Sequence, residues 1–251
     1  MASGCSWLRG YQARVRAEQA FARGAAAAER NDLATAQSTF AEALRLEPNS
    51  ASLHARVGMA YMSPIGLTSP IGPPYTELRL APAARALPHL KRALELDPRQ
   101  PPEVYLQALL AAVRLGREEW ARQVLAQAAT RCANDAIWLN NIAYALVDAD
   151  KLTADALPLL ERAVELEPKS GIIVDSLGWA HYRRGDFSRA AQLLERASSL
   201  TPDNAEIEYH LGAVYAELGR TAQARAQFRR ALKLDPALGR AHAALRGLEG
   251  K

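Results

Sequence analysis

The stretch that decides the fold is residues 171–202, GIIVDSLGWAHYRRGDFSRAAQLLERASSLTP, together with the related stretch that follows it, residues 205–236. Each has apolar residues at helical spacing, a glycine near its middle and a proline at its end. This pattern predicts two short helices joined by a tight turn. Pro168, Pro202 and Pro236 are evenly spaced, and their period of about 34 residues is typical of stacked helix–turn–helix units.

Small residues occupy the positions of this unit where helices must approach one another closely. Gly178 on the first helix and Ala190 and Ala197 on the second leave room for a neighbouring backbone, because a larger side chain would wedge the helices apart. Gly185 suits the left-handed residue that closes a helix. Pro202 stops the second helix, because proline has no N–H to continue it. The unit is therefore expected to form a tightly packed helical hairpin.

Leucine, an acidic residue and proline follow one another at the end of several of these stretches. The prolines of this motif include Pro48, Pro98 and Pro168. The interval from Pro98 to Pro168 is about twice the period and leaves room for two units, the first of which is degenerate and closes near Asn134. The interval from Pro48 to Pro98 holds one period and an insertion, in which residues 63–74 repeat Ser-Pro-Ile-Gly. Prolines and glycines predict a projecting loop here, which either binds a partner or is a tolerated insertion in a surface turn.

With this period and these positions, the chain resembles the tetratricopeptide repeat family over roughly residues 15–248. The resemblance implies an all-α fold, a right-handed solenoid of about six helix–turn–helix units plus a C-terminal capping helix. Its concave groove would be lined by the first helix of each pair, and its stability would come from stacking between neighbouring units. The expected division is an N-terminal tail, six units, the second with the insertion 63–81, and the capping helix: 1–14, 15–50, 51–100, 101–135, 136–170, 171–204, 205–238 and 239–248.

Aromatic and polar side chains gather on the predicted groove side of the first helices. In a chain with 6% aromatic residues, such a cluster predicts a hot-spot patch for a partner polypeptide, because aromatic side chains dominate interface energies. The alternative is that these side chains pack between the repeats. The predicted groove residues are Asn140, Tyr144, Asp175, Trp179, Tyr182 and Tyr209.

The resemblance implies a protein-interaction scaffold or adaptor that binds a protein or peptide partner. Some relatives grip the terminal carboxylate of a peptide with a clamp of basic residues, but the corresponding surface here offers Met59, Asn140, Asp175 and Trp179. Recognition of a chaperone tail is therefore not expected. This groove would suit an extended segment or an apolar helix that carries a basic residue.

The formal net charge of +4 is unevenly distributed along the chain. Residues 220–251 carry +6 and residues 1–30 carry +3, which leaves −5 for the residues between them. A nucleic-acid-binding protein more often shows a continuous basic stripe. A helical-repeat RNA-binding protein that uses the basic C-terminal end is therefore an alternative to the scaffold. On the capping helix, Arg240 and Arg246 are expected to face solvent.

The first residues leave a second alternative open. Residues 2–5, Ala-Ser-Gly-Cys, resemble the end of a bacterial lipoprotein signal, in which the cysteine carries the lipid, but the apolar stretch that should precede it is missing. As written, the sequence predicts a cytoplasmic protein. With an upstream signal it would be a periplasm-facing lipoprotein attached through Cys5, an assembly factor of the bacterial envelope. No run of 18 or more apolar residues predicts a transmembrane helix.

Motifs of common enzymes do not occur in the sequence, which has no HExxH, GxxxxGK[ST], GxSxG or GxGxxG. Cys5 and Cys132 lack the spacing of a metal or redox site. His89 and His210 have no acidic or cysteine partner at ligand spacing. We therefore expect no enzyme activity, no cofactor, no metal and no small-molecule substrate.

Overall fold

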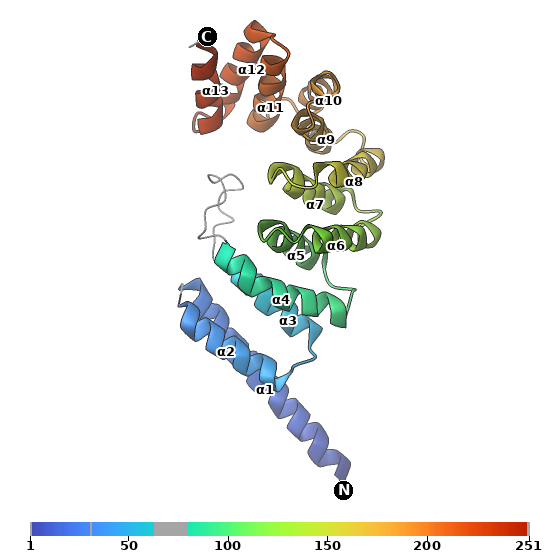
Figure 1. Ribbon diagram of the computed structural model, residues 1–251, viewed down its shortest axis with the longest axis vertical. Helices are drawn as coiled ribbons and strands as arrows, with labels where there is room; N and C mark the ends of the chain where they lie inside the picture. Colours follow the sequence, from blue (N-terminus) through green and yellow to red (C-terminus); the bar gives the residue numbers. More distant parts are fainter. Residues whose placement is uncertain (1, 31, 63–79, 250–251) are drawn as a thin grey trace. The chain divides into compact units, whose positions relative to one another are not determined.

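The computed structural model describes residues 2–30, 32–62 and 80–249, and all regular secondary structure in these ranges is α-helical (Figure 1). The all-α repeat fold that the sequence predicted is therefore confirmed. The helices are α1 (Ala2–Glu29), α2 (Leu33–Leu46), α3 (Ala51–Met62), α4 (Leu80–Leu96), α5 (Pro102–Arg114), α6 (Glu118–Arg131), α7 (Ala136–Asp148), α8 (Thr153–Leu166), α9 (Gly171–Arg183), α10 (Phe187–Leu200), α11 (Ala205–Glu217), α12 (Thr221–Leu234) and α13 (Gly239–Glu249).

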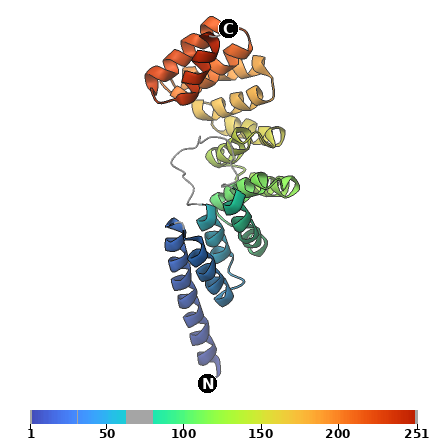
Figure 2. The same ribbon diagram turned by 60° about the vertical axis from the view of Figure 1, so that its left-hand side comes forward.

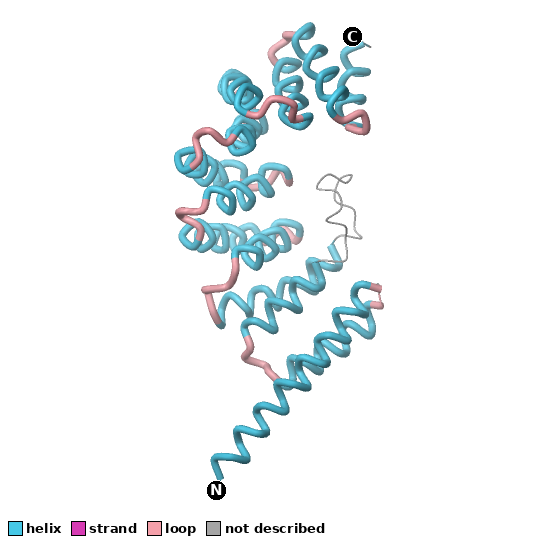
Figure 3. The backbone as a smooth tube through the Cα atoms, turned by 180° about the vertical axis from the view of Figure 1, so that it is seen from behind, coloured by secondary structure: helices cyan, strands magenta, loops and turns pink. Residues whose placement is uncertain are grey.

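The chain divides into two compact units, Met1–Gln127 and Ala128–Lys251, and the division falls within α6. In the first unit, α1 pairs with α2 and α3 pairs with α4. In the second unit, α7 pairs with α8, α9 with α10 and α11 with α12, while α13 packs against α12 (Figure 2). The first helices of the second unit also pack on one another in order, α7 on α9 and α9 on α11. Figure 3 shows the short loops that join α7 to α8, α9 to α10 and α11 to α12 in the second unit.

The turn between α9 and α10 is closed as the sequence predicted. Gly185 has a φ of +81°, in the left-handed region that favours glycine, and the N–H of Asp186 donates to the carbonyl of His181 at 3.0 Å. The Asp186 carboxylate then accepts from the N–H of Arg189 at 3.2 Å and caps the start of α10. Gly219, one repeat after Gly185, has a φ of +71° at the corresponding turn.

Close contact between the two helices of a pair depends on glycine. A Cβ added at Gly178 on α9 would lie 2.8 Å from Cγ of Leu194 on α10, and one at Gly212 on α11 would lie 2.7 Å from Cδ1 of Phe228 on α12. Both large side chains are buried, and so are the alanines that flank them along α10 and α12. The hairpin core is therefore built from a bulky side chain of the second helix that fits over a glycine of the first.

Prolines mark the ends of the second helices, as the sequence predicted. α8 ends at Leu166, α10 at Leu200 and α12 at Leu234, each two residues before a proline. The next backbone N–H, at the position between leucine and proline, still donates to a carbonyl four residues earlier, and the helix stops there.

The N-terminal segment differs from the expectation. Residues 2–14, which the sequence assigned to an N-terminal tail, form the first half of α1, a helix of 28 residues. No proline interrupts this stretch, and its alanine, leucine and arginine residues favour helix. Of the predicted insertion 63–81, residues 63–79 lie outside the described ranges, whereas residues 80 and 81 belong to α4; the side chain of Cys5 also lies outside what is described. Among the described helices, none is long and apolar enough to cross a membrane.

Replacement of Gly178 by alanine is expected to destabilise the second unit. Overpacking against Leu194 costs about 1–3 kcal/mol, and the better helix propensity of alanine offsets at most about 1 kcal/mol of it. Gly247→Ala on α13 is the matched control, because a Cβ there meets nothing within 4 Å. Urea unfolding should show a lower midpoint for Gly178→Ala and an unchanged or higher one for Gly247→Ala. Equal midpoints for the two variants would contradict the packing described above.

Candidate functional site

The candidate site lies on α7, α9 and α11, the first helices of three consecutive pairs in the second unit (Figure 1). Asn140, Asp175 and Tyr209 follow one another at intervals of one repeat, and so do Tyr144 and Trp179, so each set occupies equivalent repeat positions. Side chains three, four or seven residues apart share one side of a helix. The α7/α9/α11 face comprises Ile137, Asn140, Tyr144, Ile172, Asp175, Trp179, Tyr182 and Tyr209.

A stack of rings forms the centre of this face. The Trp179 indole lies parallel to the Tyr182 ring on α9, with centroids 4.5 Å apart, and to the His210 ring on α11, with centroids 4.0 Å apart. Tyr209 lies beside the stack, 6.4 Å from Trp179 and 5.8 Å from Phe228. Trp179 is 8% exposed, whereas Tyr182 and Tyr209 are partly exposed. Trp179 therefore packs beneath the surface against the tyrosines, and the exposed parts of Tyr182 and Tyr209 are available for contact with a partner.

A buried polar network lies beside the rings. Nδ1 of His210 is 2.9 Å and 3.0 Å from the two carboxylate oxygens of Asp175, and Nε2 is 3.7 Å from Oε1 of Glu206. The Arg240 guanidinium, from α13, contacts the Glu206 carboxylate and lies over the Tyr209 ring, 4.6 Å from its centroid. The network therefore ties α9, α11 and α13 together through side chains that are mostly removed from solvent.

These contacts correct two expectations from the sequence. His210 has two acidic partners: Glu206 lies one helical turn away, and Asp175 lies one repeat away on the neighbouring helix. Arg240 was expected to face solvent, but its side chain is largely covered because Glu206 and Tyr209 engage it. Arg246, further along α13, is exposed as expected.

Burial and acidic charge shape the electrostatics of this region. Burial raises the pKa of the Tyr144 phenol, and the nearby carboxylates of Asp148 and Asp175 raise it further. Burial also raises the pKa of Asp148, although the surrounding cations oppose this shift. Burial lowers the pKa of Arg240, against the effect of Tyr144 and the two aspartates. The Tyr144 phenol therefore stays protonated and able to donate a hydrogen bond, beside carboxylates that would attract a cation.

The six predicted groove residues do come together on one face, but the structure buries half of them. Asn140, Asp175 and Trp179 are buried, so they hold the face in shape and offer little surface. Tyr144, Tyr182 and Tyr209 are partly exposed.

Sequence reasoning missed two apolar residues of the face. Ile137 and Ile172 are 59% and 56% exposed, and they lie one repeat apart at equivalent positions near the starts of α7 and α9. Each lies seven residues before an aromatic residue of the face, Tyr144 or Trp179, and so shares its side of the helix. The repeat spacing could have identified them, but an isoleucine at helical spacing is usually a core residue.

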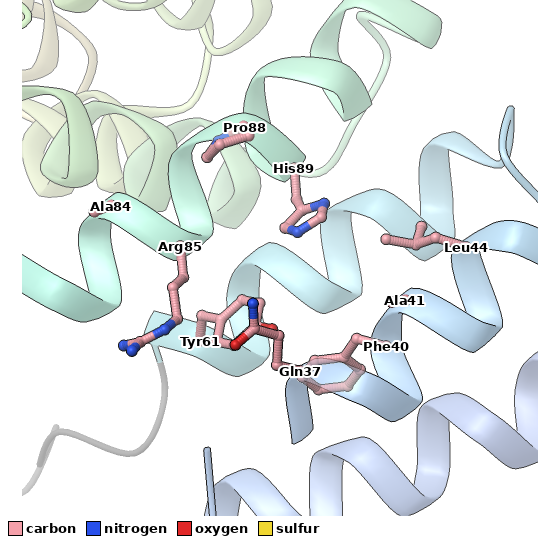
Figure 4. A pocket seen from close by; sticks show the side chains of 9 residues that line it. All are labelled: Gln37, Phe40, Ala41, Leu44, Tyr61, Ala84, Arg85, Pro88 and His89. Atoms are coloured by element: carbon pink, nitrogen blue, oxygen red, sulfur yellow. The ribbon is translucent and has the colours of Figure 1, made fainter. Parts of the chain in front are cut away.

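The first unit holds a pocket of about 280 Å³ between α2, α3 and α4 (Figure 4). Phe40 meets Tyr61 edge to face at 5.2 Å, and the Tyr61 ring stacks on His89 at 6.0 Å. Figure 4 shows Gln37, Phe40 and Tyr61 close together, with His89 beside them. The residues that line the pocket are Gln37, Phe40, Ala41, Leu44, Tyr61, Ala84, Arg85, Pro88 and His89.

His89 is a titratable group whose pKa this pocket shifts. Burial lowers the pKa of His89 below its usual value, and the nearby ring of His54, 5.7 Å away, adds to the effect. The folded state therefore favours the neutral imidazole. In the part of the chain that the structure describes, no three His, Cys, Asp or Glu side chains are grouped so that they could hold a metal ion.

Comparisons with known proteins agree with this fold. The sequence profile of the tetratricopeptide repeat matches residues 176–239. No curated protein matches the chain. Among solved structures, TTC0263 of Thermus thermophilus is similar over 80% of this chain and 100% of its own, with 20% identity and a TM-score of 0.54. MamA of Desulfovibrio magneticus RS-1 is similar over 75% of this chain and 96% of its own, with 20% identity and a TM-score of 0.52. YrrB is similar over 82% and 97%, with 20% identity and a TM-score of 0.51.

Helix pairs that recur at a constant period, packed first helix on first helix, define an α-helical repeat protein. The profile match identifies residues 176–239 as tetratricopeptide repeats, and the solved structures show that the chain has the fold of such repeat proteins.

Acid is expected to destabilise the first unit through His89. The folded pKa of His89 lies below the unfolded value of about 6.5, so the unfolded chain binds the proton more tightly. Stability contributed by neutral His89 is complete above the unfolded pKa and is lost as the pH falls through the folded pKa. Urea unfolding of the native chain and of His89→Phe at about pH 7.5 and about pH 5 tests this. The native chain should lose more stability between the two pH values than the variant, and equal losses would refute the role of His89.

Proposed function

We propose that this protein is an interaction scaffold that holds a partner polypeptide against the α7/α9/α11 face. One observation carries the proposal. Ile137 and Ile172 are large apolar side chains more than half exposed on the same face as partly exposed tyrosines. Exposed apolar side chains that gather in this way are typical of protein-binding surfaces.

The face is also held in place before any partner arrives. Trp179 is clamped between Tyr182 and His210, and His210 is held by Asp175. Tyr209 is covered on one side by the Arg240 guanidinium. Side chains that are ordered in the free protein lose little conformational entropy on binding, so such a face favours affinity.

The charges near the face indicate the chemistry of the partner. Asp148 lies at the end of α7 with part of its side chain exposed, and Glu217 lies close enough to Tyr182 to influence its pKa. An extended segment or an amphipathic helix with apolar anchors and a basic residue would complement this surface. YrrB, which shares the fold, is described as having an unusual peptide-binding site, which supports the use of such repeats to hold peptides.

The RNA-binding alternative is less well supported by the contacts of the basic C-terminal end. Arg230 lies 3.3 Å from the buried carboxylate of Glu208, and Arg240 contacts Glu206. Arginines already engaged by carboxylates contribute less to phosphate binding. We therefore propose that the chain acts by binding protein, without catalysis.

The double variant Ile137→Ser/Ile172→Ser tests the proposal. A partner is first recovered with the native chain by affinity purification from the source organism and identified by mass spectrometry. Removal of two exposed anchors should weaken its binding by at least about tenfold, measured by calorimetry, while the thermal unfolding curve stays unchanged because neither side chain is in the core.

Trp7→Ser/Tyr11→Ser on α1 is the matched control, because these side chains are equally exposed and lie outside the face. The control should bind the partner as the native chain does. The proposed function would be refuted if the Ile137→Ser/Ile172→Ser variant bound every recovered partner as tightly as the native chain does.

A further inference from the structure

The N-terminal half of α1 carries a second group of exposed apolar side chains. Trp7, Leu8, Tyr11 and Val15 are 69%, 50%, 57% and 39% exposed, and Trp7 and Tyr11 stack with ring centroids 5.8 Å apart. At about 100° per residue, positions 7, 8, 11 and 15 fall within one stripe about 100° wide. This set is the α1 stripe, and it has the form of one face of an amphipathic helix.

The α1 stripe faces away from the rest of the first unit. α1 packs against α2 and α3 through small residues, among them Ala17, Ala20 and Ala27, which are buried. On the helical wheel these alanines lie about 130–170° from the centre of the α1 stripe. Figures 1 and 3 show the N-terminal part of α1 extending past the end of α2. No described part of the first unit therefore covers the stripe.

The same segment is purely basic. Residues 1–17 include Arg9, Arg14 and Arg16 and no acidic residue. Arg14 lies 3.5 Å from Glu47 and is still 73% exposed. On the helical wheel Arg14 lies at one edge of the stripe, whereas Arg9 and Arg16 lie about 130–150° from its centre, on the polar side of the helix.

We propose that the α1 stripe binds the surface of an anionic lipid bilayer. The helix would lie in the plane of the interface, with Trp7, Leu8, Tyr11 and Val15 at the boundary between headgroups and acyl chains and the arginines at the lipid phosphates. Tryptophan and tyrosine favour this depth, because their rings are apolar and their N–H and O–H groups are polar. The helix lies on the membrane and does not cross it, in agreement with the hydropathy of the described helices.

A second copy of the chain suits this surface less well. Two α1 stripes packed together would bring the arginines of both helices into one small interface, and the nearest acidic side chains, Glu18 and Glu47, are already paired with Arg56 and Arg14. Like charges at that separation repel, whereas an anionic bilayer attracts all of them. The chemistry of the segment therefore favours lipid over self-association.

Flotation of the full chain with lipid vesicles tests the proposal. All proteins carry Cys5→Ser, so that no lipid attached at that residue contributes. The chain should float with phosphatidylcholine vesicles that contain about 30% phosphatidylglycerol, should not float with phosphatidylcholine alone, and should be released by about 0.5 M salt. Trp7→Ser/Tyr11→Ser should lower the apparent affinity at least about tenfold, and Arg16→Gln by about fivefold.

Ile137→Ser/Ile172→Ser is the control for the lipid experiment, because it removes equally exposed apolar side chains elsewhere. It should float as the native chain does. The Trp7→Ser/Tyr11→Ser variant therefore tests lipid binding and the Ile137→Ser/Ile172→Ser variant tests partner binding, so the two proposals can fail independently. Equal flotation with neutral and anionic vesicles would overturn the proposal. An absence of flotation would also overturn it. In that case, loss of a dimer or of a complex with an acidic protein in Trp7→Ser/Tyr11→Ser would show that the stripe binds protein instead of lipid.

Discussion

Two helices of about fourteen residues bury too little apolar surface to fold alone. The repeat structure therefore depends on further apolar surface that each pair buries against its neighbours. Within a pair, a bulky side chain of the second helix fits over a glycine of the first, as Leu194 does over Gly178. Between pairs, α7, α9 and α11 pack on one another and α13 covers the last second helix, α12. The same stacking that stabilises the hairpins also brings equivalent residues of successive repeats side by side, and so it creates the α7/α9/α11 face.

The terminal helix α13 has two roles in this arrangement. It shields the apolar side of α12, and it brings Arg240 to Glu206 and Tyr209. Through Glu206 and His210 this contact reaches Asp175 on α9, so polar side chains link three helices that are far apart in the sequence. Such a network is favourable only while each charged group keeps its partner, because an unpaired buried charge is costly. The shape of the candidate binding face therefore depends on the end of the repeat array as well as on the repeats themselves.

The fold could be predicted from the sequence because its determinants repeat. The even spacing of prolines, the glycines of the turns and the alanines of the second helices each have a local reason, and the structure confirms the helix ends and the turn at Gly185. The site was less predictable. That Trp179 would be buried between Tyr182 and His210 depends on the distance between α9 and α11, which no spacing within one helix reveals.

The N-terminal half of α1 escaped prediction for another reason. It lies before the first repeat, so periodicity had nothing to compare it with. Its exposed aromatic side chains, Trp7 and Tyr11, contact each other within α1, and such a pair alone does not show whether another helix covers it.

Stacking as the source of stability is tested most directly with two fragments of the second unit. One is the hairpin of residues 171–202 alone, and the other is residues 171–249, which adds α11, α12 and α13. Far-UV circular dichroism during urea unfolding should show the hairpin largely unfolded in water and the longer fragment helical with a cooperative transition. A hairpin that is fully helical alone and unfolds at the same urea concentration as the longer fragment would contradict the account.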